Sequence, residues 1–149
     1  MNFVSKEPIN KGWSSDKKYC VTDETGTKYL LRISAFSQEE KKRAEFDMMN
    51  QVAALGVPMC RPLEFGTCKD GVYSLQSWIE GSDAEAYIPA LSDTKQYAYG
   101  LEAGRILRKI HSIPAPAGQE DWESRFNRKM DYKIQKYRSE EHTSELQSR

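Results

Sequence analysis

A short apolar run followed at once by a long amphipathic segment constrains the fold of this chain more than any other feature. Residues 29–33 read Tyr-Leu-Leu-Arg-Ile, a set of strand-forming residues with one arginine among them. This is the pattern of a strand that is buried on both faces. Because a cation inside such a strand needs a partner, the sequence predicts an acid close to Arg32.

The segment after this strand is predicted to be a helix. Ser37 and Glu40 match a capping box, so we expect a helix over residues 38–55, which Gly56 and Pro58 then end.

Glu45 lies in the middle of the stripe of this helix that is otherwise apolar. The apolar members of the stripe are Met48, Met49, Val52, Ala53 and Leu55. A carboxylate on a buried face is rarely left unpaired. A strand cation with an inward helix acid is the arrangement with which kinases hold the α and β phosphates of a nucleotide. The same pair is also compatible with a purely structural bridge between a sheet and its covering helix.

Length and charge narrow the class of protein. The 149 residues suit one ordinary domain, or one domain and part of another. Basic and acidic residues number 22 each, which argues against a nucleic-acid or anionic-membrane partner. The sequence shows no signal region and no apolar run near the ~20 residues of a membrane span, so we expect a cytoplasmic protein. Its 3 cysteines lack metal-type spacing, and we expect reduced thiols.

Further strand-like segments complete a five-stranded antiparallel sheet. Pro8 to Val21 reads as two strands joined by the loop 11–16, and the turn 23–26 leads into the third strand. A second strand pair covers residues 62–68 and 72–79. The predicted fold class is therefore α+β, with five strands and one long helix in the first part of the chain.

The loop 11–16 reads Lys-Gly-Trp-Ser-Ser-Asp. A loop of small and hydroxyl residues between the first two strands of a nucleotide-binding sheet can close over phosphates with its backbone N–H groups. An ordinary hairpin loop has the same composition, and a single glycine does not separate the two interpretations.

A domain junction is predicted where the fifth strand ends, at residues 77–81, because strand character gives way there to Gly81 and Ser82. Junction backbone is a common place for a planar base to bind, and a plain linker packed by Trp78 is the alternative. We therefore expect a first domain over residues 1–80 and a second over residues 81–137.

Two helices are predicted in the second domain. Residues 93–111 carry two adjacent apolar stripes, typical of a helix that is covered on most sides, and Pro114 prevents its continuation. Residues 120–137 place aromatic and aliphatic side chains at helical spacing. We interpret both as the start of a helical domain.

Residues 138–149 break the apolar rhythm and hold a single aliphatic residue, Leu146. Residues 138–148 also read, residue for residue, as an in-frame translation of a widely used sequencing-library adapter. Our hypothesis is that the gene was truncated near Tyr137 and read through into adapter, so that this tail is not native. A longer version of the same gene that kept these codons would contradict the hypothesis.

Four segments, taken in this order, resemble the aminoglycoside phosphotransferase family, which has a protein-kinase-like fold. They are Arg-Ala-Glu-Phe-Asp-Met-Met (43–49), Gly-Val-Pro (56–58), Trp-Ile-Glu-Gly (78–81) and Leu-Arg-Lys-Ile-His-Ser-Ile-Pro (107–114). The resemblance covers residues 8–137. It implies a kinase-like small lobe, followed by the first helices of an incomplete helical large lobe.

The resemblance also implies site residues. Arg32 stands where the family usually has its phosphate-binding lysine, and Glu45 stands where the helix partner of that lysine lies. Ser14 and Ser15 would lie over the phosphates, and the backbones of two further residues would face adenine, Ser77 and Ile79. Arginine is a departure from the family pattern, because a guanidinium is bulkier than an ammonium group and binds phosphate oxygens in a fork.

The activity implied by the resemblance is transfer of the γ-phosphoryl group of ATP or GTP to a hydroxyl group of a small molecule, with Mg²⁺. An aminoglycoside antibiotic is the default acceptor, and choline, homoserine, fructosamine and macrolide acceptors are the alternatives.

The catalytic loop of that family, His-x-Asp-x-x-x-x-Asn, is not found, since neither His111 nor His142 begins it. Its aspartate accepts the substrate proton and its asparagine holds Mg²⁺. We therefore expect no catalytic residue and no metal ligand in this chain, and no activity from the chain alone. Two other interpretations stay open: a non-catalytic module that binds nucleotide or a protein partner, and an interaction domain that Arg32 and Glu45 only brace.

Overall fold

The computed structural model describes the backbone of residues 2–147 and the side chains of residues 2–139. The chain forms two compact units, Met1–Ile113 and Pro114–Arg149. The first unit contains the sheet, and the second contains the helix α4 (Trp122–Gln147). The domain boundary after residue 80 and the non-native origin of residues 138–149 stay predictions.

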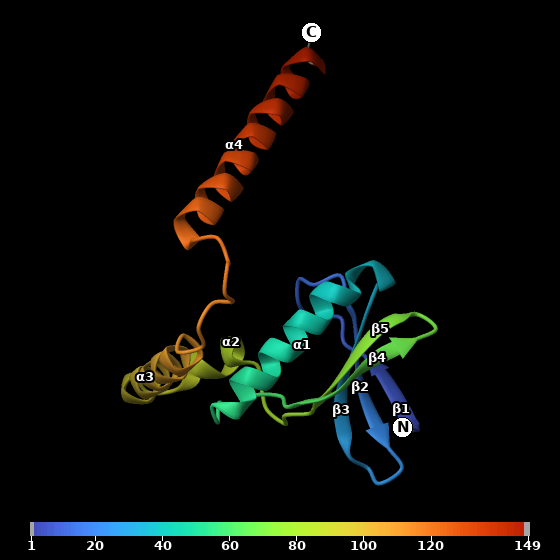
Figure 1. Ribbon diagram of the computed structural model, residues 1–149. Coiled ribbons are helices and arrows are strands. Elements are labelled where there is room, and N and C mark those ends of the chain that lie inside the picture. Colours follow the sequence, from blue (N-terminus) through green and yellow to red (C-terminus); the bar gives the residue numbers. More distant parts are fainter. Residues whose placement is uncertain (1, 148–149) are drawn as a thin grey trace. The chain divides into compact units, whose positions relative to one another are not determined.

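The predicted five-stranded antiparallel sheet is confirmed, with the strand order β1-β2-β3-β5-β4 (Figure 1). Its strands are β1 (Phe3–Pro8), β2 (Lys17–Asp23), β3 (Lys28–Ser34), β4 (Pro62–Cys68) and β5 (Gly71–Ser77). The first strand lies earlier in the sequence than predicted. Pro8 was expected to begin this strand, but it is the last residue of β1 and pairs with Tyr19. Phe3, at the start of β1, packs against the core.

The sheet has one apolar face and one mixed face, because successive residues of a strand point to opposite sides. Leu31 and Ile33 of β3 belong to the apolar face, where they are buried with Val21 and Leu75. Partly buried side chains surround this cluster: Phe3, Tyr19, Tyr29, Cys68 and Tyr73. Arg32 and Ser34 alternate with the core residues and therefore lie on the opposite face.

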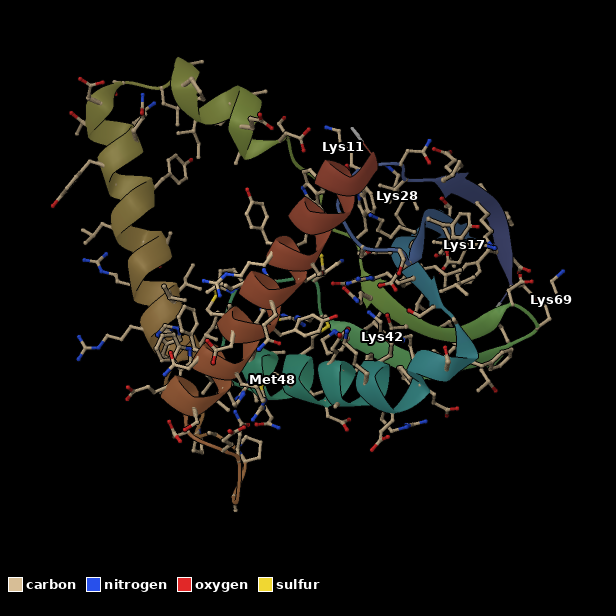
Figure 2. The ribbon with its side chains drawn as sticks, turned by 90° about the horizontal axis from the view of Figure 1, so that it is seen from above. Lys11, Lys17, Lys28, Lys42, Met48 and Lys69 are labelled. Carbon is tan, nitrogen blue, oxygen red and sulfur yellow. The ribbon has the colours of Figure 1, made fainter. Side chains whose placement is uncertain are left out.

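The helix α1 (Glu39–Ala54) crosses this second face (Figure 1). Lys42, Phe46 and Met49 are its half-buried residues toward the strands, and the ring of Phe46 lies 5.6 Å from that of Phe65. Of the predicted stripe, Met49, Val52 and Ala53 are half-buried, whereas Met48 is 40% exposed. The buried side of α1 is therefore shifted toward Phe46; Figure 2 marks Met48 on this helix.

The start of α1 also differs from the prediction. A 3₁₀ turn, Phe36–Gln38, precedes the helix, and Gln38 occupies the N-cap position without a side-chain hydrogen bond to the helix. Ser37 lies inside this turn, so the capping box does not form. The 3₁₀ turn supplies backbone hydrogen bonds at the helix start instead, such as that from Gln38 N–H to the carbonyl of Ala35.

Gly71 opens β5 where two backbones approach closely. Its φ is +144°, and a Cβ atom at this position would lie 2.0 Å from the carbonyl oxygen of Ser34. No side chain fits at such a distance, so the β4–β5 turn requires glycine in order to set β5 beside β3.

Two short elements, α2 (Ala84–Tyr87) and η2 (Ile88–Ala90), lead to α3 (Asp93–Ile110), whose predicted bounds are confirmed to within one residue. No residue of α3 is buried, and Tyr97 is 74% exposed. The expectation that this helix is covered on most sides is therefore not met by the residues that the structure describes.

The helix α4 begins after Asp121, whose Oδ1 accepts a hydrogen bond of 2.9 Å from the backbone N–H of Ser124. It continues past its predicted end at Tyr137 to Gln147. Across the described residues, no helix is long and apolar enough to cross a bilayer.

Candidate functional site

Arg32 lies in the middle of β3, at the centre of the sheet. The register places it opposite Lys18 on β2 and opposite Ser74 on β5, so all three side chains belong to the face that α1 crosses. The side chain of Arg32 is 31% exposed. A central strand therefore fixes the backbone of this cation while its guanidinium keeps access to solvent.

Asp16 is the direct acidic partner of Arg32. The side chain of Asp16 is 4% exposed, and its Oδ2 atom lies 2.6 Å from Nη2 of Arg32. Oδ1 accepts a hydrogen bond of 2.8 Å from the hydroxyl of Ser34. Because a buried carboxylate is costly unless it is paired and hydrogen-bonded, these contacts are what allow an acid to lie here.

Asp16 was missed as a site residue by the sequence analysis, which treated it only as the last residue of a loop. Its position follows from strand register, because Lys17 pairs with Ile33 and the preceding residue then comes beside Ser34. Nothing in the spacing of the sequence fixes that register, so the signal was absent before β2 and β3 were paired.

The charges around Asp16 change its acidity. Burial by itself raises the pKa of this carboxyl, but the hydrogen bond from Ser34 and the positive charges of Lys42 and Arg32 outweigh burial. The pKa of Asp16 therefore lies below its ordinary value, and the carboxylate is ionised at neutral pH.

Lys42 of α1 is a second cation at this site, and it too was missed. Its Nζ lies 3.1 Å from Oδ2 of Asp16 and 2.9 Å from Oε2 of Glu45, and its side chain is 16% exposed. Figure 2 shows Lys42 where α1 passes the strands. Burial alone lowers the pKa of Lys42, whereas its bonds to the two acids raise the pKa by more, so that it lies above its ordinary value.

The predicted direct pair between Arg32 and Glu45 does not form in the described structure. The ion pairs run instead from Arg32 to Asp16, from Asp16 to Lys42 and from Lys42 to Glu45. Glu45 lies at the edge of the helix face with a side chain 45% exposed, because the helix is rotated from the predicted orientation. Arg32 and Glu45 nevertheless line the same cavity of about 20 Å³, which holds about one water molecule.

The β1–β2 loop lies beside this cluster, since it ends at Asp16. Ser14 and Ser15, the predicted phosphate contacts, are exposed. The ammonium group of Lys18 donates a hydrogen bond to the backbone carbonyl of Lys11, and the side chain of Lys11 pairs with Asp83 in the segment after β5. The loop is thus attached at both ends while its hydroxyl residues face solvent.

The predicted adenine segment begins at Ser77, the last residue of β5. The backbone N–H of Ser77 donates a hydrogen bond of 2.9 Å to the carbonyl of Arg61, and the hydroxyl of Ser77 accepts one of 2.8 Å from Arg61 N–H. This leaves the backbone of Ile79, a residue that is 54% exposed, as the better candidate for a base contact. Glu80 pairs with Lys28 at 2.8 Å, which fixes the end of the segment to β3.

Kinases use Mg²⁺ to neutralise the charge of the phosphates, so a member of this class needs residues that can hold the ion. Within residues 2–139, no group of three or more histidine, cysteine or acidic side chains could hold a metal ion. The acid at the centre of the cluster, Asp16, is already occupied by two cations. The described residues therefore do not fit Mg²⁺.

A five-stranded antiparallel sheet, crossed by one long helix on the face that carries a central-strand cation, defines the small lobe of a protein-kinase-like fold. Residues 6–149 match the family model described as the phosphotransferase enzyme family, APH. The chain belongs to this family, and the resemblance seen in the sequence is confirmed.

Among solved structures, the chain is similar to an aminoglycoside-3'-phosphotransferase of type VIII, with a TM-score of 0.52 and 17% sequence identity. The match covers 80% of this chain and 41% of that structure, so the chain spans less than half of the length of the structure it resembles. At this identity the likeness shows the fold. No curated protein sequence matches the chain.

Proposed function

We propose that the protein to which this chain belongs transfers the γ-phosphoryl group of ATP or GTP to a hydroxyl group of a small molecule, with an aminoglycoside as the first acceptor class to test. Membership of the phosphotransferase family supports the reaction type. The solved structure with the same fold is an aminoglycoside-3'-phosphotransferase, which supports the acceptor class.

The observation that carries this proposal is the guanidinium of Arg32, held on the central strand beside the end of the β1–β2 loop. A guanidinium has five N–H donors, and the contact with Asp16 engages Nη2. The remaining donors suit the oxygens of a nucleotide phosphate, which arginine binds in a fork. Backbone N–H groups of the loop that contains Ser14 and Ser15 would complete the phosphate contacts.

Nucleotide binding by the 149-residue chain tests the first half of the proposal. ATP and GTP are titrated into the wild-type chain and into the variant Arg32→Gln, with binding followed by ligand-observed NMR. We expect the variant to lose at least about tenfold in affinity, since charge-assisted phosphate contacts are worth about 1.5–3 kcal/mol. The matched control is Lys17→Gln, because Lys17 pairs with Ile33 on the opposite face of the sheet and should leave binding unchanged.

A wild-type chain that binds neither nucleotide would contradict the proposal. Equal losses in Arg32→Gln and Lys17→Gln would also contradict it, because they would show a general effect of charge rather than a contact.

The phosphoryl-transfer step is tested with a longer form of the gene, since the 149 residues contain no His-x-Asp-x-x-x-x-Asn motif. We expect that motif downstream of the codon for Tyr137, and we expect the 149-residue chain itself to bind nucleotide without transferring phosphate to kanamycin. Absence of the motif from the longer gene would favour the second candidate function, a non-catalytic module that binds nucleotide or a protein partner.

A further inference from the structure

Asp16, the acid that contacts Arg32, lies on a different element from Glu45, the acid that the family pattern places beside this cation. Glu45 lies on α1, whereas Asp16 lies between the β1–β2 loop and β2. Asp16 is also the more buried of the two, with a side chain 4% exposed against 45% for Glu45. The cluster is therefore organised around the loop acid rather than around the helix acid.

Two cations and a hydroxyl converge on this one carboxylate. Oδ2 of Asp16 receives Nη2 of Arg32 at 2.6 Å and Nζ of Lys42 at 3.1 Å, while Oδ1 receives the hydroxyl of Ser34 at 2.8 Å. With three donors from β3 and α1, the carboxylate has a fixed orientation. It therefore joins the loop end, the central strand and the helix.

Arginine suits this arrangement better than lysine does. Its planar guanidinium can give one N–H edge to Asp16 and present other donors elsewhere, whereas an ammonium group is a point charge without a fixed fork. Arg32 is 31% exposed, so the guanidinium is anchored at one end and accessible at the other. The pairing with Asp16 thus accounts for an arginine at the position where relatives usually have lysine.

Glu45 is connected to this centre through Lys42. Its Oε2 atom lies 2.9 Å from Nζ of Lys42, and the same Nζ contacts Asp16. The four groups carry two positive and two negative charges. Removing the charge of Asp16 leaves two cations, Arg32 and Lys42, close together without the negative charge that stabilises both. The guanidinium of Arg32 then loses the ion pair that fixes its position.

We infer that Asp16 is a positioning residue for phosphate binding: it holds the guanidinium of Arg32 in place, with Lys42 as the relay through which Glu45 contributes. This inference rests on the proposed function, because it assumes that Arg32 binds a nucleotide phosphate. It assigns to Asp16 and Lys42 the role that the family pattern gives to the helix acid alone.

The test uses Asp16→Asn in the full 149-residue chain, a change that keeps the shape of the side chain and removes its charge. Affinity is measured by ligand-observed NMR for ATP and GTP and for the matching nucleosides, adenosine and guanosine. We expect about a tenfold loss for the triphosphate that binds the wild type more tightly, and a change below about twofold for its nucleoside. The matched control is Asp47→Asn, an exposed acid on α1, which should change neither.

A thermodynamic cycle shows whether Asp16 acts through Arg32. In an Arg32→Gln background the triphosphate affinity starts lower, and we expect Asp16→Asn to reduce it by less than about twofold, because the cation that Asp16 orients is gone. A tenfold loss in both backgrounds would overturn the inference.

A second variant covers the case in which Asp16→Asn fails to fold. Lys42→Gln shortens the network at its helix end, and we expect it to lower triphosphate affinity about threefold and to leave nucleoside affinity unchanged. Unchanged triphosphate binding in Lys42→Gln would overturn the inference when Asp16→Asn cannot be measured.

The outcomes separate the two proposals. No triphosphate binding by the wild type means that the proposed function fails. Triphosphate binding that Asp16→Asn leaves intact overturns only the positioning role, and so does an equal loss of triphosphate and nucleoside, which would show that the variant merely loosens the fold.

Discussion

The carboxylate of Asp16 and the guanidinium of Arg32 meet at 2.6 Å although they are 16 positions apart in the sequence. The contact exists because β2 and β3 pair in an antiparallel register that places Lys17 opposite Ile33. It joins the end of the β1–β2 loop to the central strand. A loop that covers phosphates and a cation that binds them would therefore be held in a fixed relation.

The stability of the first unit should fall at both extremes of pH. The pKa of Asp16 is lowered in the folded chain, so its contribution is present above the unfolded value of about 3.9 and is lost as pH falls through the folded value. The pKa of Lys42 is raised, so its contribution is present below about 10.4 and is lost as pH rises through the folded value. Between about pH 5 and pH 9 we expect a plateau.

Urea unfolding checks this profile, followed by the fluorescence of Trp78 in a chain whose Trp13 and Trp122 are both replaced by Phe. In Asp16→Asn the dependence on pH below about 4 should become shallower. An unchanged acid limb would show that other carboxyls control it.

Leu75→Ala should destabilise the sheet by about 2–5 kcal/mol, the usual cost of truncating a fully buried leucine. Leu75 is 1% exposed and belongs to the cluster with Val21, Leu31 and Ile33. The control is Leu63→Ala on β4, where the side chain is 49% exposed and the cost should stay below about 1 kcal/mol. Similar losses in the free energy of unfolding for the two variants would contradict the assignment of the core.

Gly71→Ala should cost about 3 kcal/mol, because its Cβ would lie 2.0 Å from the carbonyl oxygen of Ser34 and the backbone must move. Gly26 provides the comparison, since it also has a positive φ, +83°, but has open space around its Cβ position. Gly26→Ala should therefore cost only the strain of the left-handed conformation, about 1–2 kcal/mol. The free energies of unfolding in urea measure the difference, and equal costs would contradict the close approach.

The chain should associate with itself through α3 as concentration rises. Tyr97, Leu101 and Leu107 fall on one stripe of this helix and are 74%, 46% and 51% exposed, and exposed apolar stripes promote association. The double variant Leu101→Lys with Leu107→Lys should lower the average mass in sedimentation equilibrium, whereas Lys95→Gln on the same helix should not. A wild-type chain that stays monomeric at about 100 μM would contradict this prediction.

Periodicity and turn chemistry predicted most of the secondary structure. The turn of residues 23–26 formed as expected, because the carboxylate of Asp23 accepts hydrogen bonds from the backbone of Thr25 and Thr27. The helix α1 ended near Gly56 as predicted. Local signals of this kind act within a few residues, so the sequence contains them fully.

The side of α1 that faces the sheet was harder to predict from the sequence, because a helix in which polar and apolar residues are interspersed has more than one stripe that could be buried. The predicted stripe centred on Glu45 counted Met48 as buried, whereas packing against Phe65 placed Phe46 on the buried side together with Met49, which the prediction had included. The capping box at Ser37 was a valid local alternative that lost to the 3₁₀ turn. Tertiary contacts decided both points.

The sequence by itself determined the α+β class, the order of the strands along the chain, and the presence of a cation at the centre of the sheet beside a helix with an acid. Only the tertiary structure decided which acid that cation contacts. The physical reason is that periodicity specifies which face of an element a side chain occupies, whereas the pairing of Asp16 with Arg32 depends on the register between two strands and on the rotation of α1, both of which are set when the whole sheet packs.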